Sequence, residues 1–245
     1  MKILLLFLLS FSVANTSFAA AKKRGGKGAF AGGSMSIGAG LALATADQTG
    51  LNSMIATAKT SAASTAGNMS SATEYFGYFT FRFANGFTAI QLRPSLFTQS
   101  SSGSGSDGSH SYDLEGFTIF PMARIIPLSN DLIDFYIQGG LGYGKLDGTV
   151  KNGAREAKFS GSAFGVQMGL GAEFCFVPEH CFNLEGNYRY LPIARNIVSS
   201  GTGPANLPYG SSQAQADKEL EDLNGSDVAT TLSGLSGAIS YTFNF

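Results

Sequence analysis

The sequence has few charged residues and, beyond its N-terminus, no long apolar run. Charged side chains make up 13% of the 245 residues, whereas roughly 25% is usual in soluble globular domains. No apolar run after the N-terminus approaches the ~18 residues that a membrane-spanning helix needs. The net charge is −1, which gives no electrostatic footprint for nucleic acid. The 32 glycines, 20 phenylalanines and 9 tyrosines favour strands over helices.

The N-terminus has the pattern of a secretory signal peptide. Lys2 precedes an apolar stretch at residues 3–13, and small residues follow at 17–21, where cleavage is expected. We expect residues 1–20 to be the signal peptide, 21–29 a basic, glycine-rich periplasmic lead, and 30–245 the folded domain. The alternative is a retained membrane anchor, for which the stretch is short. No cysteine lies near the cleavage site, so lipoprotein processing is not expected.

The end of the chain alternates strictly between two kinds of residue. Ile239, Tyr241, Phe243 and Phe245 are large and apolar, and the residues between them are small or polar. This period of two is typical of a strand whose faces meet different environments. Similar patterns occur at residues 35–43, 74–84, 88–96, 112–126, 135–145, 164–174 and 182–190, ahead of the terminal strand at 230–245.

The connections between these eight segments alternate in length. Long polar stretches occupy residues 45–72, 100–111, 147–160 and 199–227, and short turns occupy 85–86, 127–131 and 177–180. Membrane barrels sort their connections in this way. Because lipid offers backbone groups no partners, such a sheet must close on itself. The sequence therefore predicts an all-β fold, an eight-stranded antiparallel up-and-down transmembrane β-barrel with long extracellular loops and short periplasmic turns.

The Asn85-Gly86 dipeptide is a strong hairpin signal and sets a register. A two-residue turn at this point places Thr80 opposite Gln91 and Arg82 opposite Ala89, which agrees with the alternation of the two segments.

The facing of segment 112–126 is ambiguous. Asp113 and Glu115 share a face with Phe117, while Arg124 shares a face with Phe120. A β-bulge, or acidic residues lying above the apolar band, would resolve the conflict.

Four segments resemble a known family. They are residues 138–144 (QGGLGYG), 164–176, 184–190 (LEGNYRY) and the terminal alternation Tyr241, Phe243, Phe245. The sequence resembles the small eight-stranded outer-membrane barrels of Gram-negative bacteria, the OmpA-like, OmpX-like and opacity-type group. The resemblance implies a location in the outer membrane, contact with lipid and lipopolysaccharide, and a terminal strand (Ile239, Tyr241, Phe243, Phe245) that the barrel-assembly machinery reads. Members of this group include adhesins, structural tethers and small channels.

Polar residues of the strand segments define the expected interior. They are Glu74, Arg82, Gln91, Arg93, Gln138, Gln167, Glu173, Glu185 and Arg189. They could form a charged conduit or a packed, salt-bridged interior. An eight-stranded barrel is just wide enough for side chains to fill it, so we favour the packed interior.

The seam beside the first strand is expected to be the roomiest part of the interior. Ser236, Ala238, Ser240 and Thr242 should line it, and the first strand contributes glycines.

The two cysteines flank the turn at 177–180. Cys175 and Cys181 have the same parity as Glu173 and Glu185, so both should point inward. Direct pairing would place Gln167 opposite Arg189. Because the periplasm is oxidising, we expect a disulfide; the alternative is two reduced thiols. A metal site is not expected, with only His180 nearby.

No catalytic constellation stands out, and neither an enzyme nor a cofactor is expected. His110 lies in a Ser/Gly-rich stretch without a positioned nucleophile or carboxylate. Residues 139–145 read G-x-x-x-x-G-K, but Leu146 replaces the hydroxyl residue of a phosphate-binding loop and no helix follows.

Two long connections carry charged residues. The third has Lys151, Arg155 and Lys158, which are either a solvated surface or a contact with lipopolysaccharide. In the fourth, residues 218–222 have the pattern of a short helix.

The leading hypothesis for function is an envelope structural or surface-interaction protein, adhesin-like, with a side-chain-filled lumen and loops that bind an extracellular ligand. The alternative is a narrow, porin-like channel for small solutes. A lipid-modifying enzyme is the least favoured hypothesis.

Overall fold

The computed structural model describes residues 33–130, 132–202, 217–222 and 226–245. The expected signal peptide at 1–20 and basic lead at 21–29 lie outside these residues. No helix in the described ranges is long and apolar enough to cross a membrane.

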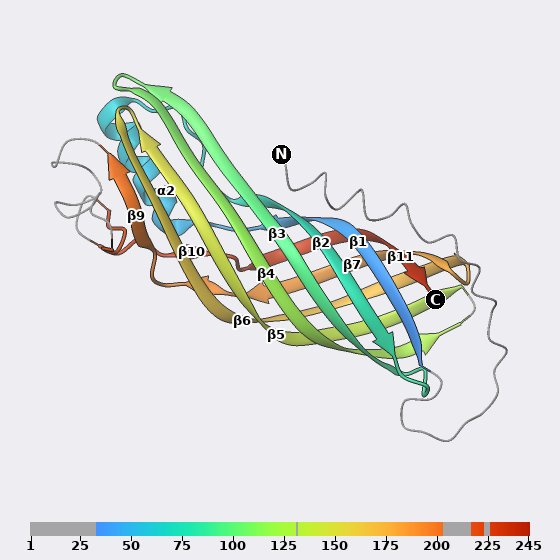
Figure 1. Ribbon diagram of the computed structural model, residues 1–245. Coiled ribbons are helices and arrows are strands. Elements are labelled where there is room, and N and C mark those ends of the chain that lie inside the picture. The colour runs from blue at the N-terminus through green and yellow to red at the C-terminus, as the bar shows by residue number, and fades with distance from the viewer. Residues whose placement is uncertain (1–32, 131, 203–216, 223–225) are drawn as a thin grey trace, which may run out of the picture. The chain divides into compact units, whose positions relative to one another are not determined.

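Eight antiparallel strands form a closed ring, which confirms the predicted fold (Figure 1). Each strand pairs with the next along the chain, and β11 pairs with β1 to close the ring. The strands are β1 (Ser34–Thr45), β2 (Ser71–Arg82), β3 (Thr88–Gly105), β4 (Gly108–Ser129), β5 (Ile133–Asn152), β6 (Arg155–Val177), β7 (His180–Tyr190) and β11 (Gly234–Asn244).

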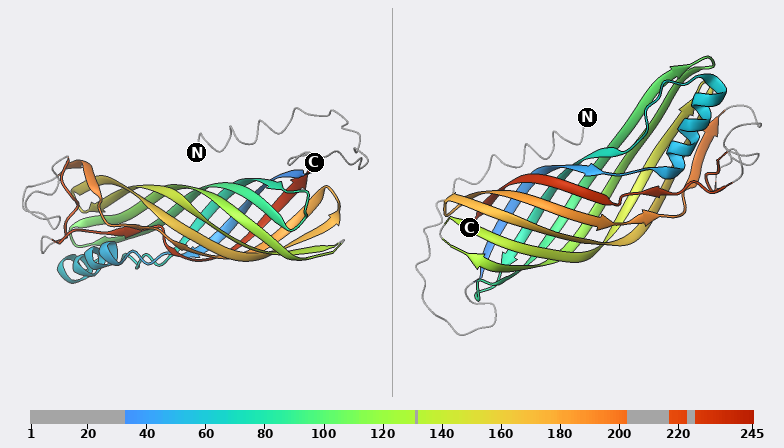
Figure 2. Two further views of the ribbon diagram at one scale, coloured as in Figure 1. Left: turned by 90° about the horizontal axis from the view of Figure 1, so that it is seen from below. Right: turned by 180° about the vertical axis from the view of Figure 1, so that it is seen from behind.

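Smaller elements gather at one end of the ring. They are the helix α2 (Thr49–Ala62), the strand β9 (Ile197–Thr202), which pairs with β6, and a short pair made by β8 (Pro192–Ile193) and β10 (Thr230–Thr231). We call these elements, together with the described residues of the connections around them and the tips of the β3–β4 and β5–β6 hairpins, the cap. The cap lies at one end of the strands and the C-terminus at the other (Figure 2).

The register follows the turns. Thr80 pairs with Gln91 and Arg82 with Ala89, as the Asn85-Gly86 signal predicts. Gly86 has a φ of +69°, a conformation that suits glycine. The Asn85 side chain accepts hydrogen bonds from the backbone of Phe87 and Thr88 and so stabilises the turn.

Two predicted loops are instead strand ribbons. Residues 100–111 and 147–160 continue β3–β4 and β5–β6 as paired strands, with turns at 106–107 and 153–154. The polar composition of these stretches hid an inward alternation that includes His110, Val150, Ala157 and Phe159, all of which are buried. These four strands are 18 to 23 residues long, whereas about 9–11 residues cross a bilayer. They therefore extend well beyond a membrane.

Two local predictions in the connections also change. The turn of helix expected near residues 53–59 is a 14-residue helix, α2. The short helix expected at 218–222 is wrong, since Glu219 and Glu221 form isolated β-bridges with Ile197 and Asp227.

The structure shows which residues of β4 face the interior, because the conflicting residues lie at different heights along the barrel. Its even-numbered residues, including Phe120 and Arg124, point inward along the strand. Asp113 and Glu115 share the outer face with Phe117 but lie toward the cap, above the apolar residues.

A belt of exposed apolar side chains surrounds the ring. Leu141, Phe164 and Leu170 are 70%, 83% and 67% exposed, and every strand contributes similar residues. At the end away from the cap the belt is aromatic, with ring contacts that join Phe176 to Phe182 and Phe182 to Tyr241. Such a surface is costly in water but matches lipid.

Candidate functional site

The middle of the barrel is filled by buried ion pairs. Glu185 on β7 accepts a short hydrogen bond from Arg93 on β3, and Arg124 on β4 lies 3.6 Å from the other carboxylate oxygen. Arg189 pairs with Glu74 at 2.9 Å. All five side chains are at most 7% exposed. Buried charges are tolerated when they are paired in this way. The ion pairs connect β7 to β2, β3 and β4 across the interior of the ring.

Aromatic rings and amides complete this layer. The guanidinium carbon of Arg93 lies 3.6 Å from the centroid of the Phe76 ring, and that of Arg124 lies 3.8 Å from the centroid of Tyr136. Tyr136 Oη donates to Glu185 at 2.8 Å. These contacts stabilise the charges of Arg93, Arg124 and Glu185, which are buried away from water.

The seam between β1 and β11 is filled rather than roomy, so that prediction is wrong. A Cβ on Gly38 would lie 2.2 Å from Tyr78 Cζ, and a Cβ on Gly40 would lie 2.6 Å from Phe76 Cζ. Tyr78 Oη lies 2.6 Å from Thr242 Oγ1 and accepts a hydrogen bond from Asn183 Nδ2. The glycines make space for aromatic rings that reach across from β2.

The nine polar residues singled out in the sequence all come from the inner face. Seven are buried, namely Glu74, Gln91, Arg93, Gln138, Gln167, Glu185 and Arg189. Arg82 and Glu173 lie nearer the turn end and are partly exposed. Sequence reasoning missed five inner residues with polar contacts, which are Tyr78, Arg124, Tyr136, Asn183 and Asn187. Their parity places them on the inner face, but a tyrosine has an apolar ring and the alternation of β4 alone leaves the facing of Arg124 open.

A polar vestibule of about 530 Å³ occupies the end of the barrel nearest the short turns. Arg82 and Asp134 form an ion pair of 2.5 Å in its wall. Glu173 also lines it and, among the described residues, has no ion-pair partner. The ion-pair layer lies between this vestibule and the cap.

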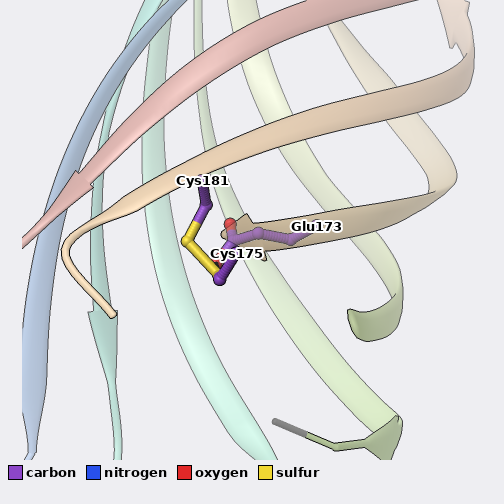
Figure 3. Close-up of side chains that lie close together, drawn as sticks. All are labelled: Glu173, Cys175 and Cys181. Carbon is purple, nitrogen blue, oxygen red and sulfur yellow. Dashed lines mark hydrogen bonds between the residues drawn. A yellow bond between two sulfur atoms is a disulfide. The ribbon is translucent and has the colours of Figure 1, made fainter. Parts of the chain in front are cut away.

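A disulfide holds the turn between β6 and β7 (Figure 3). It joins Cys175 to Cys181, whose Cα atoms are 4.1 Å apart. Glu173 and the two sulfurs lie within 4.8 Å of one another, but sulfurs bonded to each other lack the thiolate form that binds metal.

The same turn receives the end of the chain. Asn244 N donates to Glu179 O at 2.9 Å, and Asn244 Nδ2 donates to Pro178 O at 3.1 Å. On the other side, Phe245 N donates to Met35 O at 2.9 Å. The disulfide therefore constrains the turn on which the terminal strand ends.

The cap has a hydrophobic core of its own. Leu51 and Ile55 from α2 are fully buried and belong to one cluster with inward residues of the long hairpins and of β8 and β9. The cluster continues down to Phe120 and Met122, inside the ring. An apolar layer thus lies above the ion pairs.

Gln48 links three parts of the cap. It is fully buried, and its Nε2 donates to Gln99 Oε1 at 2.9 Å and to Thr231 O at 2.8 Å. Its Oε1 accepts from Thr231 N at 2.9 Å. The segment before α2 and the strands β3 and β10 are therefore joined by one side chain.

His110 is a structural residue of the β3–β4 ribbon, and the expectation that no carboxylate is positioned beside it is wrong. It is 1% exposed, with Nδ1 2.8 Å from Asn152 Oδ1 and Nε2 2.7 Å from Asp107 Oδ1. The hydrogen bond with His110 lowers the pKa of Asp107. Burial raises the pKa of the neighbouring Tyr112 to about 12. Both ring nitrogens of His110 are occupied, so neither faces a nucleophile.

The phosphate-loop-like run at residues 139–145 lies in the extended strand β5. It makes no loop, and its last residue, Lys145, is exposed on the outer face.

No family model and no curated protein matches the chain. Among solved structures, the outer membrane protein OprG from Pseudomonas aeruginosa matches with a TM-score of 0.59 and 16% identity, over 87% of this chain and 96% of OprG. Ail, the attachment invasion locus protein of Yersinia pestis, matches with a TM-score of 0.45 and 12% identity, over 87% of this chain and 99% of Ail. Neisserial surface protein A matches with a TM-score of 0.36 and 13% identity, over 87% and 97%.

The match to OprG concerns the fold, and the closed ring and apolar belt agree with it. By its fold, the chain is a small eight-stranded β-barrel of the bacterial outer-membrane type.

Proposed function

We propose that the protein is a closed envelope barrel whose cap is a surface for interaction outside the cell, in the manner of an adhesin. The observation that supports this most is the buried core of the cap, which orders α2, β9 and the long hairpins. A surface ordered before it meets a ligand loses less conformational freedom on binding. The short turns and the terminal strand would then face the periplasm.

A closed lumen is supported by the two layers described above. Water and solutes would have to pass the pairs of Glu185 with Arg93 and Arg124, and then an apolar cluster that includes Phe120 and Met122. Small apolar spaces stay dry. The second candidate, a narrow channel, is favoured by the vestibule of about 530 Å³ at the turn end.

The apolar belt, the terminal strand and the cap each suggest a partner. Lipid and lipopolysaccharide would contact the belt, the barrel-assembly machinery would read the terminal strand, and an extracellular ligand would bind the cap. We also propose that the protein is not an enzyme, because both ring nitrogens of His110 are engaged by Asn152 and Asp107.

The test is gain of adherence. The protein would be displayed on a non-adherent Gram-negative host, and binding to epithelial cells and to matrix proteins would be counted. We expect adherence from the natural chain and a clear reduction with Gln48→Ala, which removes the link between three parts of the cap. Adherence equal to that of the empty host would contradict the proposal. Heat-dependent gel migration of the variant shows whether its barrel is intact.

A further inference from the structure

A crevice of about 330 Å³ opens on the outer face of the barrel, where β5, β6 and the residues leading into β9 meet. Its wall includes Tyr143 and Lys145 from β5, Ser160 and Ser162 from β6, and Arg195 from the segment before β9. The crevice exists because β6 changes partner at this height, from β7 below to β9 above.

The register places the crevice directly above the apolar belt. Tyr143 pairs with Phe164, and their rings are 5.4 Å apart in an edge-to-face contact. Phe164 is 83% exposed. Two residues further toward the cap on the same face, Lys145 pairs with Ser162. Aromatic residues mark the border between hydrocarbon and headgroups, so the crevice lies at the height of the lipid headgroups on the cap side.

The wall of the crevice has two cations and no carboxylate. Lys145 Nζ lies 3.1 Å from Asp147 Oδ1, with side chains 52% and 59% exposed. Arg195 pairs with Glu219, and their side chains are 73% and 25% exposed. An exposed pair such as that of Lys145 with Asp147 contributes little to stability. Lys145 is therefore held only weakly by Asp147, and the exposed Arg195 guanidinium has further N–H donors for an anion in the crevice.

We propose that this crevice binds a phosphate group of an outer-leaflet glycolipid of the lipid A class. Lys145 and Arg195 make the charged contacts, the hydroxyls of Ser160 and Ser162 donate hydrogen bonds, and the acyl chains lie against Tyr143 and Phe164. A phosphate suits this set because it offers several oxygens to donors that approach from different strands. The inference rests on the outer-membrane location in the proposed function but not on adherence.

Native mass spectrometry of the detergent-purified full chain tests the site. The probes are bisphosphorylated lipid A and the same lipid with both phosphates removed. We expect the natural chain to retain the phosphorylated lipid preferentially. The double variant Lys145→Gln/Arg195→Gln should retain it at least about tenfold more weakly, since charge-assisted contacts to two cations are lost.

The control is Lys59→Gln, which removes a cation of the cap helix α2, away from the crevice, and it should behave as the natural chain does. Equal retention of phosphorylated lipid A by the crevice variant and the control would overturn the proposal, as would equal retention of the two lipids by the natural chain. Heat-dependent migration of the crevice variant separates lost binding from lost folding. A chain that binds lipid A here but gives no adherence would refute the adhesin role alone.

Discussion

Glu185→Gln tests whether the ion-pair layer is as dry as the structure indicates. The substitution keeps the shape of the side chain but removes the charge that faces Arg93 and Arg124. Arg93 is 2% exposed and would lose its ion-pair partner. Removing one member of a buried pair costs about 3–5 kcal/mol, and we expect a loss in the free energy of unfolding of this size. The control Glu156→Gln breaks an exposed pair with Lys158, which should cost about 0–1 kcal/mol.

The assay is urea unfolding of the barrel in lipid vesicles. Because the chain contains no tryptophan, the folded fraction is best followed by gel migration of unheated samples. A second variant, Glu185→Leu/Arg93→Met, replaces the pair with apolar groups and should be less destabilised than Glu185→Gln, since well-packed apolar residues can substitute for a buried pair. If Glu185→Gln unfolds within about 1 kcal/mol of the Glu156 control, the interior is hydrated and the reasoning fails.

Three further outcomes follow from local features. Gly38→Val should destabilise the barrel by about 1–3 kcal/mol through overpacking, because a Cβ at this position meets the Tyr78 ring. Gly186→Ala should leave the stability unchanged, because nothing lies within 4 Å of the new Cβ, and the urea midpoints of the two variants test the difference. Cys181→Ser, or reduction, should lower the urea midpoint and speed hydrogen exchange in the last strand, and an unchanged exchange rate would refute the link between turn and terminus. The pKa of Asp107 is lowered by its hydrogen bond with His110, so this contribution to stability is present above the ordinary pKa of 3.8 and is lost as the pH falls through the lowered pKa. Once the slower intrinsic amide exchange in acid is corrected for, protection at the β3–β4 tip should therefore fall with pH for the natural chain, and a similar fall with Asp107→Asn would count against the mechanism.

Strand positions and registers could be predicted from the sequence, because they follow from an alternation with a period of two residues. The strict alternation around Asn85-Gly86 and around the two cysteines gave registers that place Thr80 opposite Gln91 and Gln167 opposite Arg189. The alternation predicts strands with one face toward lipid, and their sheet must close because lipid offers the backbone groups of an open edge no partners.

Contacts that depend on tertiary packing could not be predicted in this way. The ribbon at residues 100–111 is rich in serine and glycine, and its strand structure depends on a cap core that only the folded chain assembles. Gln48 acts through Gln99 and Thr231, which are 51 and 183 residues away. The small residues of β1 and β11 predict an open seam, because their sequence does not reveal that Tyr78 of β2 reaches over them.

Single-channel recording in planar lipid bilayers tests the closed lumen most directly. The natural chain, inserted as a folded barrel, should show no conductance steps above the baseline of protein-free membranes, because charges paired around Glu185 and the apolar cluster above them fill the passage. Reproducible steps of one size in the natural chain would contradict the account and favour the narrow channel.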